Sequence, residues 1–101
     1  MSFSISWDLS ALETYNEEVA FILLKWNVKE VQKFKELVDE NLMRLSLNPE
    51  IGVFNLQSKI YTLVISKQTT LHYDFDITKN EIELIVFWNN SQNPDDLAKL
   101  L

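Results

Sequence analysis

The sequence predicts a single α+β domain in which a strand and a helical hairpin precede a four-stranded antiparallel meander and a short C-terminal helix. Apolar residues recur at helical spacing in two segments of the first half, and after Gly52 the period changes to two, as in strands. The 101 residues are 47% hydrophobic and 24% charged, a balance typical of one globular core. We therefore expect one domain that spans residues 1–101.

The first elements are predicted to be a strand and a helix. Residues 2–7 alternate between serines and large apolar side chains, which indicates a half-buried strand. Asp8 is expected to cap the helix that follows, with Ser10 and Glu13 as a second capping-box register. The apolar stripe of this helix consists of Leu12, Tyr15, Val19, Ile22, Leu23 and Trp26.

A second helix is predicted to begin almost at once. Asn27 and Glu30 form its capping box, and Asn48 with Pro49 ends it. Two amphipathic helices joined by a tight turn form a helical hairpin. The apolar stripe of the second helix consists of Val31, Phe34, Val38, Leu42 and Leu45.

Four strands are predicted in the second half of the chain, at residues 53–57, 60–66, 70–77 and 81–88. Their connections are short, which favours an antiparallel meander. The last strand carries apolar residues on both faces, so we expect it to lie in the interior of the sheet.

The segment after the last strand is polar and carries no charge until a short final helix begins. Asn93 is a suitable N-cap for this helix, and Pro94 fits its first position. We expect this segment to be a structural clasp that contacts a partner protein. Its candidate contact residues are Trp88, Ser91, Gln92 and Asn93.

The charge of the chain disfavours direct binding to nucleic acids. Nine Lys and Arg residues stand against fifteen Asp and Glu residues, a net charge of −6, whereas nucleic-acid affinity depends on basic side chains. A basic protein partner fits this charge better. The acidic residues Glu13, Glu17 and Glu18 are expected to form a helix face that is exposed to solvent. The alternative is that they bind a basic segment of a partner protein.

Several classes of protein are disfavoured by what the sequence lacks. The absence of cysteine excludes disulfides and thiolate metal sites. The N-terminus does not resemble a signal peptide, and the longest apolar run, residues 19–24, is too short to span a bilayer. We expect a soluble cytoplasmic protein that uses no cofactor and does not bind a membrane.

Two further groups of residues could carry chemistry. His72, Asp74 and Asp76 alternate along one strand, and we expect a solvent-facing surface there rather than a metal site, because no fourth ligand is evident. Lys59, Lys67, His72 and Tyr73 are the remaining candidates for handling a phosphate by acid–base chemistry. Trp7 and Trp26 lie on apolar stripes and are expected in the core.

Four stretches resemble the ParE-type branch of the ParE/RelE superfamily of type II toxin–antitoxin toxins, also called plasmid stabilisation proteins. They are ISWDLSALETY, NPEIG, IYTLVISKQTTLHYDF and IELIVFWNNSQNP, and their order covers nearly the whole chain. The resemblance implies a cognate antitoxin that wraps the toxin and neutralises it. It also implies DNA gyrase as a target.

The sequence departs from its resemblance to these toxins at positions that matter for RNA cleavage. Related sequences tend to carry arginine where Tyr61 and Ser91 stand, and the Lys-His pair reads Lys67-Gln68. In RelE-like nucleases, basic side chains stabilise the charge of the transition state, so the departures favour binding over chemistry. Two alternatives stay open: a RelE-like ribosome-dependent mRNA endonuclease, and a degenerate member that keeps only the fold and partner binding.

Overall fold

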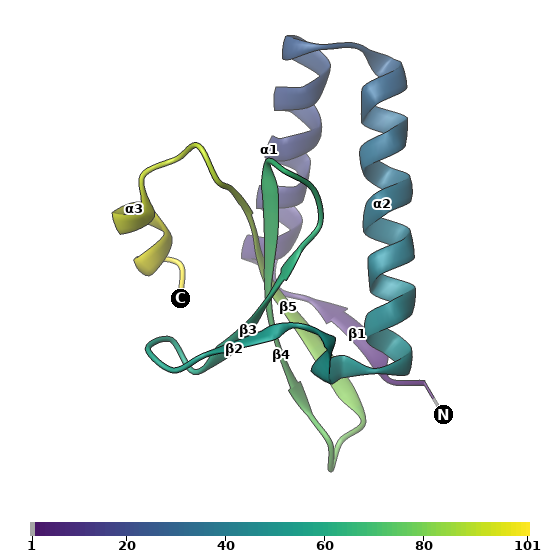
Figure 1. Ribbon diagram of the computed structural model, residues 1–101, viewed down its shortest axis with the longest axis vertical. Coiled ribbons are helices and arrows are strands. Elements are labelled where there is room, and N and C mark those ends of the chain that lie inside the picture. Colours follow the sequence, from purple (N-terminus) through teal and green to yellow (C-terminus); the bar gives the residue numbers. More distant parts are fainter. Residues whose placement is uncertain (1) are drawn as a thin grey trace.

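The computed structural model describes residues 2–101 and shows two long helices packed against one mixed sheet (Figure 1). This confirms the predicted α+β class, including the helical hairpin, the antiparallel meander and the short C-terminal helix. The predicted strand bounds differ from the observed ones by up to two residues. The elements in chain order are β1 (Ser4–Trp7), α1 (Leu9–Lys25), α2 (Val28–Leu47), the 3-10 helix η1 (Pro49–Ile51), β2 (Val53–Asn55), β3 (Ile60–Val64), β4 (Thr69–Asp76), β5 (Glu81–Asn89) and α3 (Pro94–Ala98).

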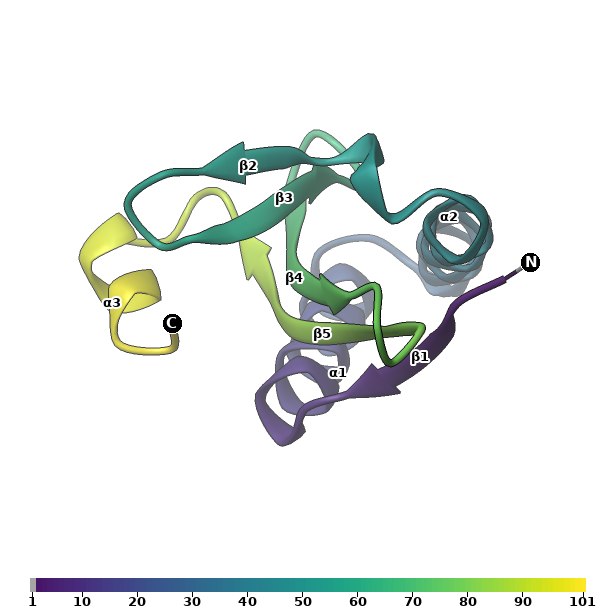
Figure 2. The same ribbon diagram turned by 90° about the horizontal axis from the view of Figure 1, so that it is seen from below.

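The sheet has the strand order β1-β5-β4-β3-β2. The N-terminal strand β1 runs parallel to β5, and all other neighbours are antiparallel. The last strand therefore lies in the interior of the sheet, as predicted. The two views place α3 on the other side of β4 and β5 from α2 (Figures 1 and 2).

A β-bulge explains why β5 is apolar on both faces. Tyr73 of β4 lies opposite Leu84, but its neighbour His72 lies opposite Val86, so Ile85 has no partner on β4. The extra residue reverses the alternation of β5. Leu84 before the bulge and Phe87 after it consequently both belong to the core beneath the helices.

Helix α1 completes the hydrogen bonding of β5 where β1 ends. The hydroxyl of Ser10 donates to the carbonyl of Ile85 (2.6 Å), and the hydroxyl of Thr14 accepts from the N–H of Phe87 (2.9 Å). Backbone groups that would otherwise lack a strand partner are thereby satisfied. Ser10 is thus used against the sheet rather than in the predicted capping box.

Of the three predicted helix N-caps Asp8, Asn27 and Asn93, the last two are confirmed. Asn48, which was predicted only to end the second helix, also caps η1. The side-chain oxygens of Asn27, Asn48 and Asn93 accept hydrogen bonds from the backbone N–H groups of Glu30, Glu50 and Asp95. Asp8 occupies the N-cap position of α1, but its side chain makes no capping hydrogen bond.

The core lies between the two long helices and one face of the sheet. The predicted stripe of α2 is confirmed, because four of its five residues are buried and Leu42 packs against them. The stripe predicted for α1 is partly wrong, since Leu12, Leu23 and Trp26 are exposed. The core cluster consists of Ala11, Ile22, Val31, Phe34, Val38, Leu45, Ile65, Leu71, Tyr73, Ile82, Leu84 and Phe87.

The single glycine of the chain is required by a close approach. The hydroxyl of buried Tyr73 donates to the carbonyl of Pro49 (2.7 Å) and accepts from the N–H of Gly52 (3.0 Å). A Cβ atom on Gly52 would lie only 2.5 Å from that hydroxyl. Since the φ of Gly52 is −76°, space rather than backbone conformation demands glycine here.

Candidate partner-binding site

The four residues considered for phosphate chemistry do not come together in the structure. Lys59 lies in the turn before β3 and Lys67 in the turn after it, so they occupy opposite ends of that strand. His72 and Tyr73 are neighbours on β4 and therefore point to opposite faces of the sheet. The hydroxyl of Tyr73 is already engaged with the backbone in the core.

His72 is buried on the sheet face opposite the long helices, with 7% of its surface exposed. The prediction of a solvent-facing strand surface is therefore wrong for this residue, although Asp76 on the same strand is exposed. Nδ1 of His72 is buried and has no hydrogen-bond partner in the part of the chain that the structure describes, and burial lowers the pKa of the imidazole. Within residues 2–101, no group of three His, Asp or Glu side chains is arranged to hold a metal ion.

The final segment is tied to the β3–β4 turn by amide side chains. Asn89 is buried, and its Oδ1 accepts from both the N–H and the hydroxyl of Ser91. The side chain of Asn90 accepts from the hydroxyl of Thr70 (3.0 Å) and donates to the carbonyl of Lys67 (3.3 Å). These bonds hold the segment in one place, as expected of a structural clasp.

A cavity of about 300 Å³ lies between α1 and the final segment, and we name it the α1–α3 cavity. Three of the four predicted contact residues line it, whereas Asn93 instead caps α3. Trp88 is 7% exposed and forms part of the wall. Its lining includes Glu17, Glu18 and Phe21 from α1, Trp88 from the end of β5, and Ser91 and Gln92 from the final segment.

The acidic run of α1 is divided by the fold. Glu13 and Glu17 are exposed, as predicted for a solvated face, but Glu18 is 5% exposed and that prediction is wrong for it. Its Oε2 accepts a hydrogen bond from the hydroxyl of Thr69 (2.5 Å). The burial of Glu18 could have been inferred from its spacing, since Ala11 and Ile22 lie seven residues before and four after it on the same helix face.

The tip of the helical hairpin is apolar and exposed, contrary to the prediction that Trp26 lies in the core. Trp26 is 53% exposed, and the neighbouring Leu24 is 88% exposed. The ammonium of Lys25 lies 5.5 Å from the ring centroids of both Phe21 and Trp26. The prediction for Trp7 is also wrong, since it is 37% exposed.

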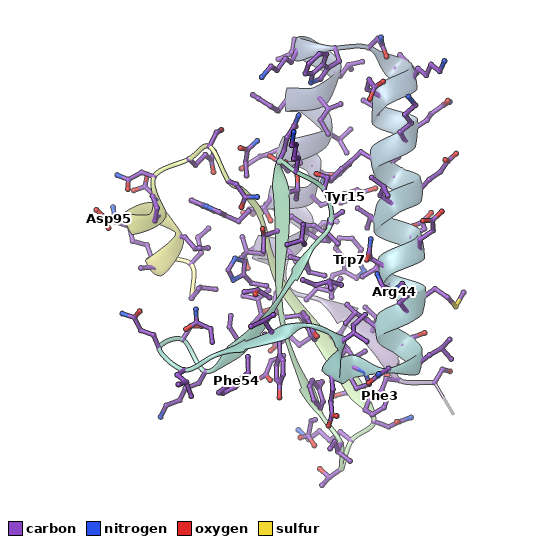
Figure 3. All side chains as sticks on the ribbon, viewed as in Figure 1. Phe3, Trp7, Tyr15, Arg44, Phe54 and Asp95 are labelled. Atoms are coloured by element: carbon purple, nitrogen blue, oxygen red, sulfur yellow. The ribbon has the colours of Figure 1, made fainter. Side chains whose placement is uncertain are left out.

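Trp7 nevertheless belongs to a group of aromatic rings that joins β1 to the helices and the sheet. Its ring stacks on Phe87 (5.3 Å) and meets Tyr15 edge-on (5.3 Å), and Tyr15 stacks on Phe34 of α2 (5.8 Å). Figure 3 shows Trp7 and Tyr15 in the region between the hairpin and the sheet, while Asp95 lies on the outer side of α3.

Comparison with solved structures identifies the fold. The chain is similar to a double arginine-to-alanine variant of the E. coli toxin RelE in the free state, with a TM-score of 0.61 and 15% identity over 100% of both chains. The chain has a RelE-like fold. Comparison of the sequence with known protein families finds no match, and comparison with curated proteins finds none either.

The RelE-like fold agrees with the fold that the sequence resemblance implies. The narrower ParE-type assignment stays a prediction. The helices described in residues 2–101 include none that is long and apolar enough to cross a membrane.

Proposed function

We propose that this protein is the toxin-like component of a type II toxin–antitoxin module that acts in the cytoplasm by binding a protein and is neutralised by a cognate antitoxin. The observation that carries the proposal is the RelE-like fold over the full length of the chain. The four stretches that resemble ParE-type toxins also support it, because they extend from residue 5 to residue 94. We treat residues 1–101 as one functional domain.

Binding rather than RNA cleavage is the mode of action that we propose. A RelE-like nuclease needs basic and acid–base groups gathered around one phosphate. Lys59 and Lys67 lie at opposite ends of β3, and His72 and Tyr73 face opposite sides of the sheet. DNA gyrase is the target that the ParE-type resemblance implies.

Co-expression tests the module directly. The chain is produced with each small protein encoded beside its gene, and affinity purification is followed by size-exclusion chromatography. We expect one neighbour to form a stoichiometric complex with the chain. If the folded chain elutes alone in every pairing, the assignment to a toxin–antitoxin module is contradicted.

Two assays separate the modes of action. Primer extension on mRNA from a reconstituted translation reaction detects cleavage, and a supercoiling assay with purified DNA gyrase detects inhibition by binding. We expect intact mRNA and reduced supercoiling. Cleavage that requires ribosomes would instead establish a RelE-like endonuclease, the second candidate, which the fold similarity to RelE favours.

A further inference from the structure

The α1–α3 cavity holds a buried carboxylate that forms no ion pair within residues 2–101. Glu18 is 5% exposed and accepts one hydrogen bond, from the neutral hydroxyl of Thr69. The ion pairs among residues 2–101 are Lys33 with Glu30 and Lys99 with Asp96, both on the surface. Because buried carboxylates in proteins are normally paired with a cation, the partner of Glu18 is expected to come from outside the chain.

We propose that the α1–α3 cavity receives the guanidinium side chain of an arginine from a partner protein. Glu17 and Glu18 supply the negative charge of the lining, and Gln92, which also lines the cavity, carries a neutral side-chain amide. Phe21 and Trp88 also line the cavity and give it aromatic residues, which favour a flat cation.

The shape and chemistry of the cavity fit a guanidinium better than other cations. Its volume of about 300 Å³ accommodates a long side chain rather than a bare ion. A guanidinium presents five N–H donors in a plane, which suits several oxygen acceptors and aromatic faces at once, whereas an ammonium is a compact point charge. The lining contributes only two carboxylates, fewer ligands than a metal site needs.

The charge of the molecule favours a partner protein as the source of the arginine. The chain carries a net charge of −6, so a basic segment of another protein is attracted to it. Two basic side chains, Lys25 and Lys67, line an adjoining depression of about 310 Å³ that shares Phe21, Asn89 and Ser91 with the cavity. They restrict the favourable position for a cation to the end near Glu17 and Glu18.

The inference rests on the proposed function in one respect, namely that the arginine belongs to a partner protein such as the antitoxin. Binding to the cavity itself can be measured without any partner. The probe is N-acetyl-arginine amide, which mimics an arginine within a chain, and the readout is the indole N–H resonance of Trp88 in ¹⁵N NMR spectra. The signals are assigned by replacing each of the three tryptophans with phenylalanine.

We expect a saturable shift of the Trp88 signal, with a dissociation constant on the order of millimolar. Glu18→Gln preserves the acceptor for Thr69 but removes the charge, and it should weaken binding about tenfold. Glu17→Gln, at an exposed position, should weaken it about twofold. Lys25→Gln is the matched control and should leave binding unchanged or slightly stronger.

Several results would overturn the inference. The first is the absence of a saturable shift; the second is an equal response to N-acetyl-citrulline amide, which has the same shape without the charge. Unchanged binding in both glutamate variants would show that the carboxylates do not hold the probe. Tighter binding of N-acetyl-lysine amide would contradict the guanidinium assignment, and tighter binding of free arginine would contradict a partner protein as its source.

The experiment can fail separately from the proposed function. An antitoxin that binds the Glu17→Gln and Glu18→Gln variants as tightly as the unchanged chain would overturn the cavity inference and leave the toxin assignment intact. Probe binding without any antitoxin complex would support the cavity and contradict the module.

Discussion

At the scale of single residues, one buried hydroxyl joins the end of the helical hairpin to the sheet. The Tyr73 hydroxyl bonds the carbonyl of Pro49 and the N–H of Gly52, and both bonds are made at the point where the chain turns from α2 into β2. This use of the hydroxyl explains why a tyrosine that could be considered for acid–base chemistry is completely buried.

Tyr73→Phe should therefore lower the free energy of unfolding by about 2 kcal/mol, because two backbone groups lose their partner in a buried site. Urea denaturation followed by circular dichroism measures the change. Tyr61→Phe is the matched control, since its ring packs against Tyr73 and its hydroxyl makes no hydrogen bond within residues 2–101. Equal stability of the two variants would contradict this role.

The carboxyl of Glu83 illustrates how crowding of like charges affects a surface residue. A hydrogen bond with Asp8, partial burial and the charges of Asp8, Asp74 and Glu81 raise the pKa of Glu83 above its ordinary value of 4.5. The protonated form is thus favoured in the folded state. Its contribution to stability is present at low pH and is lost as the pH rises through the raised pKa.

Glu83→Gln should accordingly increase the free energy of unfolding at neutral pH. The gain should shrink on acidification, because the raised pKa makes Glu83 take up a proton at a higher pH in the folded protein than in the unfolded chain. Urea denaturation at several pH values measures it, with Glu36→Gln on the exposed side of α2 as the control. A gain in unfolding free energy that grows on acidification would show that the folded state does not raise the pKa of Glu83.

At the scale of the elements, the contact between α1 and β5 depends on the hydroxyls of Ser10 and Thr14. Thr14→Val keeps the shape of the side chain but leaves the N–H of Phe87 without an acceptor. We expect a loss of about 2 kcal/mol in unfolding free energy and faster hydrogen exchange of that amide. Thr14→Ser keeps the hydroxyl and should lose less unfolding free energy. If the Phe87 amide stays protected from hydrogen exchange in both variants, the hydrogen bond from this amide to Thr14 is contradicted.

The helices were predictable because their signals are local. Asn27 with Glu30 and Asn93 with Pro94 define helix starts within a few residues, and the structure confirms both. The bulge at Ile85 was not predictable in this way. It is supported by Ser10, 75 residues away in the chain, and this contact exists only once α1 lies along β5.

At the scale of the whole molecule, the order of elements was enough to predict the fold class, but not the cavity. Trp88, Ser91 and Gln92 could be proposed from the sequence as one contact segment. The burial of Glu18 follows from its helix spacing, but its position beside them does not, because its hydroxyl partner Thr69 lies 51 residues away in the chain. Contacts of this range follow from the assembled fold.

The central claim is that this chain is a toxin-like protein that a cognate antitoxin binds and neutralises. The growth rate of a bacterial culture after induction of the chain tests it most directly, measured alone and together with the neighbouring small protein that binds it. We expect growth arrest with the chain alone and normal growth with both. Normal growth with the chain alone, while folded protein accumulates in the cells, would contradict toxicity and favour a degenerate member that keeps only the fold and partner binding.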